Sequence, residues 1–172
     1  KPHAPGGDYH GDGIMRRYSG VSVKRVDGVP SHLEYVKGTG WLYIADTGNK
    51  RVLRFDDSAT KQEKVIQGFL GDGKHYGYSQ PKVEELVPAP DGGLQQPSGI
   101  AVHGDTLYVG DAATGKIHAF DTTADAGAGG FGKHIKTFAT GLPAGKLGGI
   151  EVGPDQRLYL LDRGGKLFRV DP

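Results

Sequence analysis

Cysteine is absent from the 172 residues, and methionine and tryptophan occur once each. The lack of cysteine excludes disulfides, thiolate metal ligands, cysteine nucleophiles and c-type haem attachment. An excess of one charge is also missing, since 21 Lys and Arg residues stand against 20 Asp and Glu. A net charge near zero gives no general attraction to nucleic acid, so we expect no nucleic-acid partner. No apolar run is long enough to span a bilayer, and we expect no membrane insertion.

Glycine and proline are abundant, with 30 and 10 residues, among many short apolar runs. This composition and the length of one domain predict an all-β chain that is rich in turns. We find no Ser-His-Asp spacing, phosphate-binding loop or paired-carboxylate motif that would identify an enzyme class.

The pattern that organises the chain is WLYIADTGNKRVLRFD, from Trp41 to Asp56. A short β-favouring run ends in a turn, in which Gly48 and Asn49 suit positive φ angles. Val52 and Phe55 then mark a returning strand. The stretch therefore predicts a β-hairpin.

This hairpin recurs twice, as LYVGDAATGKIHAFD at 107–121 and LYLLDRGGKLFRVD at 158–171. A further short strand precedes each copy, and an apolar-alternating run follows the first two. The preceding strands are Leu33–Val36, Ile100–Val102 and Ile150–Val152, and the following runs are Lys64–Phe69 and Ile135–Ala139. Four strands in a recurring unit predict β-propeller blades, at about 30–70, 97–140 and 147–172.

The strings PSGIAVHGDTLYVGDAATGKIHAFD and IADTGNKRVLRF resemble NHL repeats, over Pro30 to Asp171. The resemblance implies a six-bladed propeller of four-stranded antiparallel blades, of which this chain would supply about three. NHL-type propellers include lyases, lactonase-like relatives, RNA-binding and protein-binding modules and scaffolds. We therefore expect a ligand- or protein-binding platform. The alternative is a metal-dependent propeller enzyme, lyase-like or hydrolase-like, with its site at the central channel mouth.

The pattern Ala-Asp-turn-Arg also resembles peptidylglycine amidating lyase, a propeller whose channel zinc is held by histidines. Of its features, the Arg after the repeat Asp is matched by Arg163, whereas Thr47 and Ala112 occupy the equivalent places. The strand starts hold Ser31, Ser98 and Gly148 or Gly149 instead of repeated histidines, and we count Ser31, Ser98 and Arg163 among the candidate ligand-binding residues.

His32 is the leading candidate for a ligand-binding or metal-binding residue. It stands in Pro30-Ser31-His32, where the second copy has Pro97-Ser98-Gly99. The inner strand of a blade begins beside the central channel, where side chains can face a ligand or a divalent metal such as zinc or calcium. The alternative is a histidine that fills the channel wall.

Asp46, Asp111 and Asp162 follow the second strand of every copy. We expect each carboxylate to accept backbone N–H bonds from its own turn, since an active site rarely repeats.

Residues 71–96 form an insertion that carries His75 and Tyr76 and the acidic pair Glu84 and Glu85. Long polar loops tend to project over one mouth of a propeller, which predicts a lid that contacts ligand. The alternative is a surface-packed loop whose Leu86 and Val87 lie on a blade.

Residues 1–20 are predicted to form an irregular arm, whose His3, Asp8, His10 and Asp12 are either solvated turn residues or metal ligands. Val21–Val26 predicts an unpaired outer strand, which begins a propeller segment at 21–172. Half a propeller would leave blade faces bare, so we expect a second polypeptide to complete the ring, either the other half of a longer protein or a second copy. A start at Lys1 without Met suggests processing or a fragment, and we expect an extracytoplasmic location, secreted or periplasmic.

Overall fold

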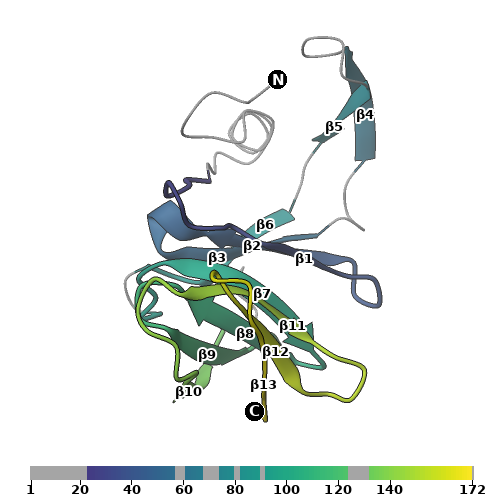
Figure 1. The fold of residues 1–172 in the computed structure, drawn as a ribbon. Helices are drawn as coiled ribbons and strands as arrows, with labels where there is room; N and C mark the ends of the chain where they lie inside the picture. Colours follow the sequence, from purple (N-terminus) through teal and green to yellow (C-terminus); the bar gives the residue numbers. More distant parts are fainter. Residues whose placement is uncertain are drawn as a thin grey trace.

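The fold is all-β and is built of antiparallel sheets that resemble propeller blades (Figure 1). The computed structural model describes residues 23–56, 61–67, 74–79, 82–89, 92–123 and 132–171, with 61–67, 74–79 and 82 described by their backbone. Three sheets of four, four and three strands follow one another along the chain, and a two-stranded sheet is separate from them.

Each blade is a meander in which neighbouring strands pair antiparallel. Blade 1 contains β1 (Leu33–Val36), β2 (Trp41–Asp46), β3 (Arg51–Asp56) and β6 (Lys82–Val87). Blade 2 contains β7 (Pro97–His103), β8 (Thr106–Asp111), β9 (Lys116–Asp121) and β10 (His134–Ala139). Blade 3 contains β11 (Leu147–Val152), β12 (Leu158–Asp162) and β13 (Leu167–Val170). A single 3-10 turn, η1 (Thr47–Asn49), joins β2 to β3 in the described part of the chain.

The core includes two apolar layers, one on each side of blade 2, and a small third cluster formed by Ile44 and Leu53 of blade 1. Between blades 1 and 2, Val52 and Leu86 pack with Ile100, Leu107 and Phe120. Between blades 2 and 3 lies a second cluster, which contains Ala101, Ile117, Leu147, Ile150, Leu158 and Leu160. Burial on both faces explains why β8 is apolar almost throughout, in the sequence Leu-Tyr-Val-Gly.

The inner strands β1, β7 and β11 begin close together at the centre of the molecule. A Cβ on Gly99 of β7 would lie 2.7 Å from the backbone nitrogen of Ile150 on β11, so only glycine permits this approach. The backbone N–H of His32, just before β1, donates to the Ser98 carbonyl of β7 at 3.0 Å. These contacts bring one end of all three inner strands to a common place.

The first turn of the repeat differs from the sequence prediction. The left-handed residue between β2 and β3 is Lys50, with φ of 58°, and neither Gly48 nor Asn49 has positive φ. Gly48 is required for another reason: a Cβ there would lie 2.9 Å from the Lys24 carbonyl oxygen, to which its own N–H donates at 2.7 Å.

The expected fourth strand of blade 1, Lys64–Phe69, is wrong. Lys61–Gln67 is β4, which pairs with β5 (Lys74–Ser79) in the two-stranded sheet, and β6 pairs with β3 instead. The physical reason is burial, because Leu86 and Val87 of β6 are both fully buried against blade 1 and its neighbour. The insertion 71–96 therefore contains two strands, and Leu86 and Val87 lie on a blade as its alternative interpretation expected, but in a buried blade strand and not in a surface loop.

The predicted strand Val21–Val26 is not a strand over its described part, 23–26. Lys24 donates its N–H to Asp46 Oδ1 at 2.7 Å and accepts the Gly48 N–H through its carbonyl. Its backbone groups are thus bound by the β2–β3 turn and cannot join a ladder. The arm 1–20 and its metal candidates lie outside the described residues. Where the chain is described, no helix has the length and apolarity needed to cross a membrane.

Candidate functional site

A hollow of about 350 Å³ lies where the inner strands meet. Its walls come from blades 1, 2 and 3, so no single repeat makes it. The polar lining is His32, Glu34, Glu151 and Tyr159, and the remaining lining is Leu33, Ile100, Gly149, Ile150, Leu161 and Leu167. Two carboxylates and no lysine or arginine line it, which gives the hollow a negative charge on an apolar surface.

His32 lies at the edge of this hollow, beside inner strand β11. Its backbone is fixed by two hydrogen bonds, to the Ser98 carbonyl and from the Ala45 N–H, each 3.0 Å long. Its imidazole lies over Gly149, where an added Cβ would be 2.8 Å from His32 Cε1. The glycine of the third copy therefore leaves room for the histidine of the first. The structure thus places His32 beside the inner strands, where both the ligand-facing prediction and the channel-wall alternative put it, and its role toward a ligand stays a prediction.

Glu34 and Glu151 occupy the same position of the repeat, on β1 and β11. Burial raises the pKa of Glu34 above its ordinary value, and the carboxylate of Glu151 raises it further. Two carboxylates that repel each other in this way favour a cation or a proton between them. Sequence reasoning missed this pair, although the shared repeat position of the two glutamates was a signal for it.

Ser31 and Ser98 hold neighbouring sheets together and do not line the hollow. The Ser31 hydroxyl is 2.8 Å from Thr47 Oγ1, and the Thr47 hydroxyl donates to the Pro97 carbonyl at 2.7 Å. Ser98 is fully buried and donates to the Gly110 carbonyl of its own blade at 3.2 Å and, more weakly, to the Gly148 carbonyl of blade 3 at 3.5 Å. The structure gives both serines a structural role between blades.

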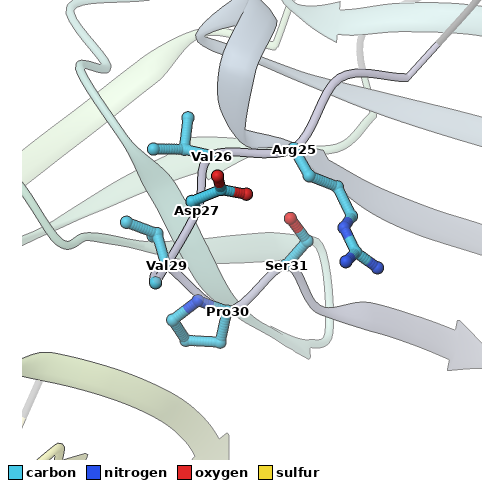
Figure 2. Close-up of a pocket in the computed structure, with 7 residues that line it drawn as sticks. Arg25, Val26, Asp27, Val29, Pro30 and Ser31 are labelled. Carbon is cyan, nitrogen blue, oxygen red and sulfur yellow. The ribbon is translucent and has the colours of Figure 1, made fainter. Parts of the chain in front are cut away.

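Arg163 is exposed at the β12–β13 turn, and Nη1 donates to the Gly145 carbonyl at 3.1 Å. Its Nη2 lies close to Gly28, at 3.9 Å from the position that a Cβ would occupy if this residue were not glycine. Gly28 belongs to the loop 25–31, which lines a second hollow of about 380 Å³. Figure 2 shows this loop, with the Arg25 and Val29 side chains pointing to opposite sides. Arg163 therefore lies beside the loop that leads into His32, outside the lining of the first hollow.

His75 and Tyr76 lie on β5, which belongs to the two-stranded sheet. Their side chains are outside the described residues, so the lid expected in this insertion stays a prediction. In the described ranges, no three His, Cys, Asp or Glu side chains are placed so as to share a metal ion. Among the described residues, His32 therefore has no pair of further imidazole or carboxylate ligands beside it, as a zinc or calcium site would require.

The three repeat aspartates differ in their partners. Asp111 caps its own turn, accepting the Ala113 N–H at 3.0 Å, and also accepts the N–H groups of Gln95 and Gln96. Asp46 accepts the Lys24 N–H and the side chains of Asn49 and Arg51, and forms no side-chain cap to its turn. Asp162 Oδ1 is buried without a hydrogen-bond partner. The predicted capping is confirmed for Asp111 and is wrong for the other two.

No family model and no curated protein matches this sequence. Solved structures do match. A luciferin-regenerating enzyme superposes with a TM-score of 0.56 at 15% identity, over 88% of this chain and 48% of that one. A catalytically inactive variant of virginiamycin B lyase from Staphylococcus aureus, solved with quinupristin, has a TM-score of 0.39 at 17% identity, over 81% and 54%. The first match shows the β-propeller fold. The chain spans about half the length of these propellers.

Proposed function

We propose that this chain supplies about half of an NHL-like propeller that serves as a binding platform, with the hollow as its ligand seat. The observation that carries the proposal is the convergence of His32, Glu34 and Glu151 from two blades on one hollow. A negative, partly apolar seat suits a basic group on an apolar body, carried by a small ligand or by a protein partner.

The proposal includes a second polypeptide that completes a six-bladed ring. Large apolar side chains are exposed on blades 1 and 3, among them Leu33 at 64% and Leu167 at 67%, and both also line the hollow, so completing blades would form a further wall of it. Soluble proteins seldom leave such faces uncovered. We favour the other half of a longer protein over a second copy of this chain, because the matched propellers are about twice as long.

A metal-dependent enzyme with its site at the channel mouth is the second candidate. Its support is that an imidazole and two carboxylates line one hollow. Since these groups do not form a three-ligand cluster within the described residues, further ligands would have to come from outside them, from the rest of this chain or from the completing blades. The platform needs no such addition, and we prefer it.

Binding of phenethylammonium, compared with the neutral phenethyl alcohol, tests the platform by calorimetry. We expect the amine to bind at least about tenfold more tightly, and Glu34→Gln or Glu151→Gln to remove that preference. Asp105→Asn, at an exposed carboxylate in the β7–β8 turn, is the matched control and should bind as the unaltered protein does. Equal binding of amine and alcohol would overturn the proposed ligand chemistry.

Metal analysis of the purified protein separates the two candidates. The platform predicts zinc and calcium well below one per chain. Stoichiometric metal that is lost in His32→Ala would favour the enzyme.

A further inference from the structure

Two histidines on the outer strands of blade 2 are joined through one threonine. His134 Nε2 is 2.7 Å from Thr137 Oγ1, and the same oxygen is 3.0 Å from His118 Nδ1. His118 belongs to β9, whereas the other two residues belong to β10. The three side chains thus tie the outermost strand of the blade to its neighbour.

His118 is the buried member of this group. It is 9% exposed, and its Nε2 is buried with no hydrogen-bond partner. Aromatic rings enclose it: Phe120 stacks with it at 6.4 Å between centroids, and His134 meets it edge-on at 6.1 Å. A proton added to His118 would therefore place a charge and an unsatisfied N–H in an apolar setting.

The charged groups around His118 do not provide an acceptor for that proton. Asp111, at the end of β8, already accepts three backbone N–H groups, and Lys116 and His134 repel a second positive charge. On blade 1, Arg54 and Glu84 form a buried ion pair at 2.6 Å, and neither residue contributes to the pKa shift of His118.

The threonine hydroxyl also couples the two rings. It has one proton, so with neutral rings it donates to one imidazole and accepts an N–H from the other. If both rings are protonated, both must donate, and the hydroxyl proton loses its nitrogen acceptor.

We propose that His118, Thr137 and His134 form an acid-sensitive latch that holds β10 against β9 and releases it when His118 gains a proton. Release would uncover the outer edge of β9 and leave the inner strands, and with them the ligand hollow, in place. The outer surface of blade 2 would then differ between neutral and acidic surroundings.

The direction of the pH effect follows from the environment of His118. Burial lowers the pKa of His118, Asp111 raises it, and His134 and Lys116 lower it, with a net decrease. The closed latch therefore binds a proton less readily than the open one, where the ordinary value of about 6.5 applies. The closed state is therefore most stable above about pH 6.5 and loses stability as the pH falls below that value. At pH 5.5 the equilibrium constant between closed and open states is lowered by at most about tenfold.

Hydrogen exchange of the purified protein, followed by mass spectrometry at pH 7.5 and 5.5, tests the latch. After correction for intrinsic exchange, we expect the protection of residues 132–140 to fall several-fold, up to about tenfold, while β7 and β8 keep theirs. His118→Gln, which cannot titrate, should abolish the acid response. His103→Gln, at an exposed histidine of the same blade, should retain it.

An acid response that persists in His118→Gln, or none in the unaltered protein, would overturn the latch. If His118→Gln does not fold, NMR titration of labelled histidines in the unaltered protein decides. A midpoint for His118 below about 6.5 supports the latch, and one at or above that value contradicts it.

Discussion

Blades 2 and 3 share one sequence repeat, yet they differ in how completely they are built. In blade 2, strand β8 is buried on both faces and a fourth strand covers the outer edge. In blade 3, β12 is buried only on the face toward blade 2, and β13 is the last strand that the structure describes. The repeat specifies a hairpin, and its neighbours determine whether that hairpin becomes a covered blade.

The repeat aspartates show the same difference at atomic scale. Asp111 of blade 2 accepts three backbone N–H groups, two of which come from the segment just before β7. Asp162 of blade 3 has a buried oxygen without a partner. The hydrogen-bond partners of a carboxylate at this repeat position are therefore determined by the segment that passes beside it, and not by the repeat itself.

The largest expected effect contrasts the two faces of β12. Leu160 is fully buried and Leu161 is 47% exposed. We expect Leu160→Ala to lower the free energy of unfolding by about 2–5 kcal/mol. Leu161→Ala should cost less than about 1 kcal/mol while the face is open, and more once completing blades cover it, although less than Leu160→Ala because Leu161 also lines the hollow. Urea denaturation of the dissociated and assembled protein measures both; a small Leu161 cost in the assembled protein would refute completion at this face.

A somewhat smaller effect contrasts the two aspartates. Asp111→Ala leaves three backbone N–H groups without their acceptor and should cost about 2–4 kcal/mol. Asp162→Ala removes a carboxylate with an unsatisfied buried oxygen, and we expect a change within about 1 kcal/mol. Denaturant midpoints compare the two variants directly. Equal losses would show that the partners of Asp111 do not account for its contribution.

The hairpins could be predicted from the sequence because their signals, an apolar run followed by turn residues, lie within a few positions of one another. In each copy the Leu-Tyr pair stands on the second strand, as predicted, and the repeat Asp, which was expected just after that strand, is its last residue. The outer strand of blade 1 could not be chosen in this way, because Lys64–Gln67 and Val83–Val87 are both β-favouring runs. Burial of Leu86 and Val87 decides between them, and burial depends on a neighbouring blade that lies elsewhere in the sequence.

The candidate site was predictable only in part. His32 was found because it departs from the repeat at an inner-strand start. Glu34 and Glu151 were missed because their proximity depends on how closely β1 and β11 approach across the centre. Ser98 was included because of its position, whereas its burial between blades became evident only in three dimensions.

The central claim is that this chain is about half of a ring that further blades complete. Size-exclusion chromatography with light scattering, together with circular dichroism, tests it most directly on the 172-residue chain alone. We predict that the chain self-associates or aggregates, and becomes monodisperse only with completing blades, because its open faces expose Leu33, Leu161 and Leu167. A folded, monodisperse monomer at 18.2 kDa would contradict the claim.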